Sequence, residues 1–362
     1  MQGLLGKQIS SLFFLDQCLT ATGMYMPFIH SDEAKEITKP CYNPHRSNIV
    51  TCNDKYIQAF LEEVGGLDFD LELASKLDRI PPYIPIFDYN SLINYELPHD
   101  TEYVGITLKD IIKSGFFYRA GTIQESNKIQ YRSTLFNSID LKSKKIILFL
   151  SGEDTIIEGV WHKKKHSNFF ETLLEMGFYA VAGFNFSLFG GECPFSHALN
   201  LKKSLFSSYL LEKYGLKTIP HVYALNQFHI VRWIAWFKQN PSIRYFTTNC
   251  QMQKDEIEIK WIVEFISKLL IEIPWLHVIL QGFNAGCLCR FGDLKNRIHL
   301  TNKRPVKYTM GNKQFTFSVN RSKLIVDAIK LNNQCTNHSN LMSVNVVEYS
   351  KYVEAILSKR QV

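Results

Sequence analysis

The sequence lacks paired cysteines. Its 362 residues include eight cysteines, but none stands in a CxxC arrangement, the spacing typical of zinc sites and redox-active disulfides. Isolated cysteines in a chain of this length indicate reduced thiols, so we expect a cytoplasmic protein. Cys287 and Cys289, with His299 nearby, form only part of a zinc site, because no third cysteine lies close to them in the sequence. We therefore predict no metal and no cofactor.

Long apolar runs and the common nucleotide-binding motifs are also missing. No segment approaches the roughly 20 apolar residues of a membrane span, and the run from Leu12 to Leu15 is too short for the core of a signal peptide. These absences argue against membrane association. No GxGxxG opens a helix and no P-loop is present, which argues against a Rossmann dinucleotide site and a P-loop nucleotide site.

What is present is the composition of a folded, mildly basic protein. Hydrophobic residues make up 46% of the chain, which is enough for a large buried core. The formal net charge is +7, and a charge of this size permits a polyanionic partner without requiring one. Nucleic acid, a nucleotide and a partner protein therefore stay open as partners.

Short apolar runs alternate with helical patterns, most clearly over residues 144–300. Runs typical of buried strands lie at 83–89, 102–108, 144–150, 178–186, 217–225, 243–249, 275–283 and 297–301. Repeated strand–helix–strand units favour parallel strands joined by right-handed crossovers. We therefore predict an α/β fold of the (β/α)8, TIM-barrel-like type. The alternative is an open, doubly wound sheet.

The remaining segments are interpreted as additions to this barrel. Residues 1–80 are predicted to form an N-terminal extension of helix and loop, and residues 81–331 a barrel-like domain with an inserted β-hairpin near 115–140. Residues 332–362 are predicted to form a C-terminal loop and helix. Alternation around the turn sequence Met-Gly-Asn-Lys predicts a second hairpin over 306–319, followed by helices near 321–331 and 347–359.

Polar residues follow nearly every predicted strand. Ligands of barrels and open α/β sheets bind at the carboxyl ends of the strands, and an amide side chain there offers donors and an acceptor to a polar ligand. The predicted substrate-binding residues are Asn185, Ser187, Asn226, Asn249, Gln251, Gln281 and Asn284. The alternative is that such residues cap the helices that follow, which is the favoured interpretation for Asn200 and Asn226.

The stretch FLSGEDTIIEGVWHKKKH, residues 149–166, combines two adjacent carboxylates with three lysines. Residues 151–167 are predicted to form a long loop, a typical place for a lid or a binding loop. Glu153 and Asp154 leave the strand end directly, and either is a candidate general acid, base or nucleophile, with Asp88 as its partner. The predicted phosphate- or nucleic-acid-binding residues are Lys163, Lys164, Lys165, Lys303 and Arg304. The alternative is a solvated surface loop.

Two further groups of residues have alternative interpretations. His221 is a candidate catalytic residue, and it could serve as the base for a nucleophilic Cys193 in the Gly-Gly-Glu-Cys-Pro turn. Trp233, Trp236 and Phe237 could stack on nucleic-acid bases. Their helical spacing favours packing in the core instead.

Residues 168–286 resemble an uncharacterised bacterial family found in phage, plasmid and other mobile-element proteins. The resemblance rests on GFNFSLFGG (183–191), the basic helix after it, YGLKTIPHVYA (214–224), Arg232-Trp233, Asn240-Pro241 and LHVILQGFN (276–284). It implies a barrel-like α/β fold and a phage or mobile-element setting, and it assigns no catalytic residue. The chain is similar, more loosely, to base-exchanging transglycosylase barrels, but Gly292 stands where their third zinc-binding cysteine would fall.

These patterns lead to one functional hypothesis and its rivals. The first is a barrel enzyme that acts on a phosphate-containing substrate, a nucleotide or nucleic acid, by carboxylate acid/base or nucleophilic chemistry such as glycosyl-bond cleavage or exchange. The second is a non-catalytic accessory protein of a phage, mobile-element or defence system that binds nucleic acid or a partner protein. The third is a metabolic barrel enzyme with a small anionic substrate.

Overall fold

A computed structural model of the protein describes residues 61–95, 98–113, 117–118, 122–123, 144–163, 169–188, 194–320, 323–331 and 337–358. Most of the expected N-terminal extension, residues 1–60, lies outside these ranges. So do Lys164, Lys165 and Cys193.

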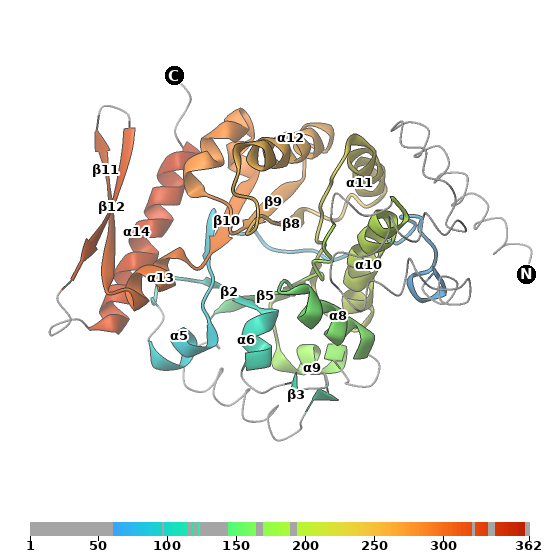
Figure 1. The fold of residues 1–362 in the computed structure, drawn as a ribbon, viewed down its shortest axis with the longest axis horizontal. Coiled ribbons are helices and arrows are strands. Elements are labelled where there is room, and N and C mark those ends of the chain that lie inside the picture. The colour runs from blue at the N-terminus through green and yellow to red at the C-terminus, as the bar shows by residue number, and fades with distance from the viewer. Residues whose placement is uncertain are drawn as a thin grey trace, which may run out of the picture.

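Eight parallel strands form the centre of the molecule (Figure 1). They are β1 (Tyr83–Pro85), β2 (Tyr103–Thr107), β5 (Lys145–Phe149), β6 (Ala180–Ala182), β7 (Thr218–Ile219), β8 (Tyr245–Asn249), β9 (His277–Gln281) and β10 (Ile298–Asn302). They pair in two four-stranded sheets, in the orders β1-β10-β9-β8 and β2-β5-β6-β7. Every pairing within these sheets is parallel. Each of the eight runs predicted as strands therefore coincides with one strand, and only β10 extends beyond its run, by one residue.

Two isolated parallel bridges join the edges of the two sheets. One pairs Ile86 with Gly105 beside β1 and β2, and the other pairs His221 with Thr247 beside β7 and β8. Backbone hydrogen bonds accompany both bridges. Each strand therefore has a neighbour on both sides, in the ring order β1-β2-β5-β6-β7-β8-β9-β10. This arrangement confirms the predicted (β/α)8-type architecture over the open doubly wound alternative.

Helices follow the strands along the chain and surround the ring (Figure 1). They are α5 (Tyr89–Asn94), α6 (Leu108–Lys113), α8 (Asp154–Lys163), α9 (Phe169–Met176), α10 (Pro194–Lys213), α11 (Gln227–Gln239), α12 (Glu256–Glu272), the 3-10 segment η2 (Ala285–Arg297) and α13 (Arg304–Met310). None of the helices in the described ranges is long and apolar enough to cross a membrane.

Two predictions about this helical layer are wrong. Residues 154–163 form helix α8 instead of a loop, because Ile157, Val160 and Trp161 recur at helical spacing and are all buried. Asn200 lies inside α10 and caps nothing, because that helix already begins at Pro194, and proline is favoured at the first position of a helix.

Alternate side chains of the strands point into the ring or out toward the helices. The inward residues form a compact apolar cluster that includes Ile84, Ile147, Ala182 and Ile279. Space inside is tight: a Cβ on Gly105 would lie 2.9 Å from the side chain of Phe149. The ring is therefore filled by its own side chains below its carboxyl end.

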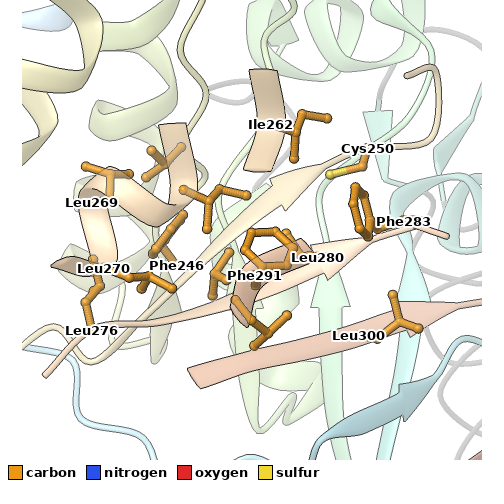
Figure 2. Close-up of a cluster of buried hydrophobic side chains, with 14 of the residues drawn as sticks. Phe246, Cys250, Ile262, Leu269, Leu270, Leu276, Leu280, Phe283, Phe291 and Leu300 are labelled. Atoms are coloured by element: carbon orange, nitrogen blue, oxygen red, sulfur yellow. The ribbon is translucent and has the colours of Figure 1, made fainter. Parts of the chain in front are cut away.

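Outward residues of β8, β9 and β10 share one buried apolar cluster with α12 (Figure 2). Phe246, Leu280 and Leu300 from the strands and Ile262 and Leu269 from the helix all belong to this cluster, and all five are buried. Full burial of one such side chain contributes about 1.5–3 kcal/mol, so this layer is a main source of stability.

The aromatic residues of α11 belong to this same buried cluster. Trp233, Trp236 and Phe237 are at most 1% exposed, and Trp233 Nε1 donates to the carbonyl of Tyr223 at 3.0 Å. The core interpretation of these residues is confirmed, since rings buried this fully cannot stack on nucleic-acid bases.

Residues 67–80, ahead of β1, are held against α11 and the end of that helix. Trp236 Nε1 donates to the carbonyl of Leu71 at 2.8 Å, and the Leu73 N–H donates to Asn240 Oδ1 at 2.9 Å. This part of the chain is thus packed on the barrel. A domain boundary near residue 80 stays a prediction.

The C-terminal part differs from its prediction. Residues 304–310 form α13, and the antiparallel ribbon consists of β11 (Lys313–Asn320) and β12 (Lys323–Lys330). The hairpin expected over 306–319 and the helix expected near 321–331 are therefore wrong. A proline in the first turn suits α13, and β-branched residues in KLIVDAIK suit β12. The last helix, α14 (His338–Ser358), includes most of the helix expected near 347–359.

A short antiparallel hairpin occurs in the first part of the insertion predicted near 115–140. Strands β3 (Phe117–Tyr118) and β4 (Thr122–Ile123) pair antiparallel. Residues 124–143 lie outside the described ranges.

Candidate active site at the carboxyl end of the ring

The carboxyl ends of all eight strands lie at one end of the ring, because the strands are parallel. Ligands of such barrels bind at this end, among the segments that follow the strands. Polar side chains that belong to or follow β2, β5, β7, β8, β9 and β10 lie at or just below this end. We describe them as three groups: an ion pair, a network that crosses the ring, and a histidine.

The ion pair joins Lys303, which follows β10, to Asp110 of α6, which follows β2. Lys303 Nζ lies 3.2 Å from Asp110 Oδ2 and 3.3 Å from Oδ1. The side chain of Asp110 is 3% exposed, and that of Lys303 is 27% exposed. In the ring order, β2 and β10 flank β1, so the pair spans the end of β1.

Local structure fixes Asp110 independently of Lys303. The sequence Thr107-Leu-Lys-Asp110 has the spacing of a capping box, in which the acidic side chain reaches back to the first residue. Asp110 Oδ2 accepts the N–H of Thr107 at 3.0 Å and also accepts its hydroxyl. The position of the Asp110 carboxylate is therefore fixed by Thr107 and does not depend on Lys303.

The network crosses the ring from one side to the other. Ser151 Oγ, after β5, donates to Gln281 Oε1 at 2.8 Å, and Gln281 Nε2 donates to Thr247 Oγ1 of β8 at 3.1 Å. Strands β5 and β9 occupy opposite positions in the ring order. Gln281 and Thr247 are 0% exposed, so this network closes the ring interior below the rim.

The histidine at this end is His221, which is 3% exposed. Burial lowers the pKa of its imidazole to about 3, so the ring is neutral at physiological pH. Its Nε2 accepts the backbone N–H of Asn249 at 3.3 Å, which assigns the proton to Nδ1. The acceptor nitrogen of His221 is therefore occupied by this backbone N–H, and a catalytic role for His221 stays a prediction.

Glu153 and Asp154, predicted as catalytic, leave the same rim in different environments. Glu153 Oε1 lies 2.7 Å from Lys109 Nζ, and its side chain is 65% exposed. Asp154 begins α8, and its Oδ1 accepts the hydroxyl of Ser187 at 2.6 Å. Of the two carboxylates, Glu153 is the more accessible to a ligand.

Several other predicted site residues hold helix ends. Asp88 Oδ1 accepts the Ser91 N–H at 2.9 Å and so caps α5, and Asn226 caps α11, as the capping interpretation predicted. Asn284 caps η2 through the Gly286 N–H. A catalytic role for Asp88 and ligand binding by the two asparagines stay predictions.

The remaining predicted binding residues lie at the strand ends without forming one cluster. Asn185 is 9% exposed, Asn249 Oδ1 accepts the N–H of Gln251 at 3.1 Å, and Gln251 itself is exposed. Arg304, next to Lys303, is exposed. Lys163 is the last residue of α8.

The cysteine and histidine set suggested as part of a zinc site does not come together. Cys287 and Cys289 lie on η2, whereas His299 lies inside the ring, 3.1 Å from His277 and 2.8 Å from the carbonyl oxygen of Pro81. Within the described ranges, no three His, Cys, Asp or Glu side chains are grouped so that they could hold a metal ion.

Sequence reasoning missed Asp110, Thr107 and Thr247. The capping-box spacing of Thr107 and Asp110 was a usable signal, because it occurs directly after an apolar run. Thr247 had no such signal, since a threonine in the middle of a strand is common.

Comparisons with known proteins add only remote likenesses. No family model matches the chain, and no curated protein matches its sequence. An oxaloacetate acetylhydrolase structure aligns at a TM-score of 0.36 and 10% identity, over 71% of this chain and 83% of that chain. An endo-beta-N-acetylglucosaminidase from Cordyceps militaris aligns at a TM-score of 0.36 and 9% identity, over 84% of this chain and 96% of that chain. Likenesses this low assign no activity to the chain.

Proposed function

We propose that the protein is a barrel enzyme that acts on a phosphate-containing substrate, a nucleotide or nucleic acid, and that Lys303 binds the anionic group. The Lys303–Asp110 pair carries this proposal. Its lysine is 27% exposed and its carboxylate only 3% exposed, so a ligand at the rim meets the ammonium. Lysine is a common partner of phosphate oxygens in proteins.

Asp110 acts on the substrate only through Lys303. A lysine side chain has a long, flexible stem, and confining it before binding lowers the entropy that the ligand would otherwise have to overcome. Because Thr107 already holds Asp110 by two hydrogen bonds, the carboxylate is a fixed point for the ammonium. We therefore assign Asp110 as a positioning residue and Lys303 as a binding residue.

Glu153 is the proposed general acid or base. Its pair with Lys109 is exposed on both sides, at 44% and 65%, and an exposed pair contributes at most about 1 kcal/mol. A substrate group can therefore replace Lys109 at little cost and exchange a proton with the carboxylate. Carboxylates at the rim of a barrel suit glycosyl-bond cleavage or exchange, which is the reaction class proposed first.

A second candidate is a non-catalytic accessory protein that binds nucleic acid or a partner protein. It is favoured by the net charge of +7 and by the HKKKH sequence at 162–166, which together suit a polyanion. The phage, mobile-element or defence setting rests on the resemblance of residues 168–286 alone. The two candidates differ in whether the carboxylates are needed.

Paired variants distinguish these proposals. Lys303→Gln removes the proposed anion-binding charge, and Lys307→Gln is its matched control, an exposed lysine of α13, the helix that begins directly after Lys303. We would measure the binding of nucleotides and of single-stranded DNA and RNA at several salt concentrations. Loss of a hydrogen bond to a charged group predicts about 10- to 100-fold weaker binding for Lys303→Gln alone. Unchanged affinity in that variant would show that Lys303 is not the anion site.

Turnover is tested with Glu153→Gln and with Glu175→Gln, an exposed control on α9. Products formed from the ligands that bind would be separated by chromatography. We expect Glu153→Gln to bind normally and to lose turnover, because an amide cannot exchange a proton. Full turnover in Glu153→Gln would end the acid/base assignment. Salt-sensitive binding of nucleic acid, with no turnover by the original chain or by either variant, would favour the non-catalytic accessory protein.

A further inference from the structure

Two neighbouring polar side chains, His221 after β7 and Asn249 at the end of β8, face the inside of the ring near its carboxyl end. His221 pairs with Thr247 in the bridge between these strands, and residues paired in a parallel bridge point to the same face of a sheet. Thr247 points inward, because its hydroxyl accepts the amide N–H of Gln281 inside the ring. His221 therefore points inward too, as does Asn249, two residues after Thr247 on the same strand.

Each of these two side chains keeps an N–H donor unpaired. His221 Nε2 accepts the backbone N–H of Asn249 at 3.3 Å, so the proton of the neutral ring is on Nδ1. Asn249 Oδ1 accepts the backbone N–H of Gln251 at 3.1 Å, which fixes the orientation of the amide. Within the described ranges, neither His221 Nδ1 nor Asn249 Nδ2 has a hydrogen-bond partner. Neither nitrogen is fully enclosed by the protein, so both donors are open to a ligand.

Two open donors without an open acceptor select one kind of ligand atom. A carbonyl oxygen has two lone pairs and no hydrogen, so it can accept from both donors. A hydroxyl group would bring a hydrogen for which no acceptor is left, because backbone N–H groups occupy His221 Nε2 and Asn249 Oδ1. An amino group would set donors against donors and leave buried N–H groups unpaired. Burial lowers the pKa of His221 to about 3, so the ring is uncharged and suits a neutral oxygen.

These donors lie across the ring from the proposed anion site. The Lys303–Asp110 pair spans the end of β1, and β7 stands opposite β1 in the ring order. Between them, the hydrogen bonds of Gln281 close the ring below the rim. An eight-stranded barrel is wide enough for one small ligand. A ligand that reaches both sides therefore carries a phosphate at one end and a carbonyl oxygen at the other.

We propose that His221 and Asn249 are specificity-determining residues that bind a carbonyl oxygen, so that the substrate is a nucleotide whose base carries a carbonyl group in place of an amino group. Bases divide into these two classes: one presents an oxygen acceptor at the position where the other presents an amino donor. This inference rests on the proposed function for the phosphate, and it adds the class of base.

Reversal of one donor tests this specificity. Asn249→Asp keeps the size of the side chain and an acceptor for the Gln251 N–H, but it replaces the open donor by an acceptor. Calorimetric titrations would compare uridine with cytidine monophosphate, and inosine with adenosine monophosphate. The original chain should bind the carbonyl member of each pair about tenfold more tightly or better. In Asn249→Asp this ratio should disappear or invert. Asn296→Asp, the same change at an exposed position on η2, is the control and should keep it.

Replacement of His221 separates ligand binding from folding. His221→Gln keeps an acceptor for the Asn249 N–H and removes the Nδ1 donor, whereas His221→Asn keeps a donor near the position of Nδ1. The affinity ratio should fall in His221→Gln and should be largely retained in His221→Asn. Urea unfolding of both variants is measured in parallel, because a purely structural role would lower stability without changing the ratio.

Lys303→Gln distinguishes a failure of this inference from a failure of the proposed function. It should weaken pyrophosphate and all four nucleotides alike and leave the affinity ratios unchanged, because both members of a pair carry the same phosphate. Equal affinity within both pairs, an unchanged ratio in Asn249→Asp or His221→Gln, or no binding of any of the four nucleotides would overturn the carbonyl site. Pyrophosphate binding that Lys303→Gln weakens would still support the anion site.

Discussion

Replacement of Gln281 tests whether the network across the ring contributes to stability. Gln281→Leu removes the acceptor of the Ser151 hydroxyl at 2.8 Å and the donor to the Thr247 hydroxyl at 3.1 Å. Both hydroxyls are then buried without a partner, at about 1–3 kcal/mol each, and the leucine side chain offsets part of this loss. We expect the free energy of unfolding to fall by about 2–4 kcal/mol.

Ser151→Ala removes the same hydrogen bond from the other side. It should cost about 1–2 kcal/mol, because it leaves the Gln281 oxygen unpaired. The two variants remove one shared bond, so their effects should not add, and the double variant should be more stable than the sum predicts by about 1 kcal/mol.

The assay is urea unfolding followed by tryptophan fluorescence, with the four proteins of the double-mutant cycle measured in parallel. The control cycle combines Gln281→Leu with Ser242→Ala, whose hydroxyl bonds to the carbonyl of Leu73 near the amino end of β8. That cycle should be additive. A coupling energy below about 0.5 kcal/mol between Ser151 and Gln281 would refute a stabilising bond across the ring.

Three further predictions concern caps, protonation and burial. Asp88→Ala should lower the free energy of unfolding by about 1 kcal/mol, because the cap of α5 is lost. Asp88→Asn should keep both stability and turnover, because asparagine caps a helix equally well. Loss of turnover in Asp88→Asn would instead show that Asp88 is catalytic. Burial lowers the pKa of His299 to about 4, below its unfolded value of about 6.5, so this residue's contribution to stability is full above pH 6.5 and is lost as the pH falls toward 4. A His299→Gln variant should show a flatter pH dependence of unfolding, and an equally steep fall would exclude His299 as its source. Lys203 and Glu158 form an ion pair whose side chains are 1% and 8% exposed. Lys203→Met should lower the free energy of unfolding by about 3–5 kcal/mol because it leaves a buried charge unpaired, and Lys203→Met combined with Glu158→Leu should recover most of this loss. Calorimetric melting of both proteins tests this, and a single variant as stable as the original chain would contradict it.

The barrel could be predicted from the sequence because its strands are short apolar runs separated by helical patterns. Residues such as Ile147 and Ile279 alternate with outward apolar residues, so the runs are apolar on both faces, as in a parallel sheet covered by helices. Closure of the ring was harder to predict. It depends on single bridges at Ile86 and His221, which leave no periodic pattern in the sequence.

The errors have local physical reasons. KLIVDAIK is apolar at five of eight positions, so its pattern suits a helix as well as a strand, and only pairing with β11 decides for the strand. The segment 151–167 began with charged and polar residues that resemble a loop. Burial of Trp161 and its neighbours against the core decided for a helix.

The candidate site was predicted in part. The rule that ligands bind at strand ends identified Lys303, Gln281 and Glu153, since each follows or ends an apolar run. It could not identify their partners, because Asp110 and Ser151 reach them from other strands of the ring. Contacts of that kind depend on the closed ring, which one-dimensional patterns do not describe.

The most direct test of the proposed function is a calorimetric titration of inorganic pyrophosphate into the full chain and into its Lys303→Gln variant. The proposal predicts binding to the full chain that weakens with salt, and a loss of about tenfold or more in affinity in the variant. Equal affinity in both proteins, or no binding to the full chain at low salt, would contradict an anion site at the carboxyl end of the ring.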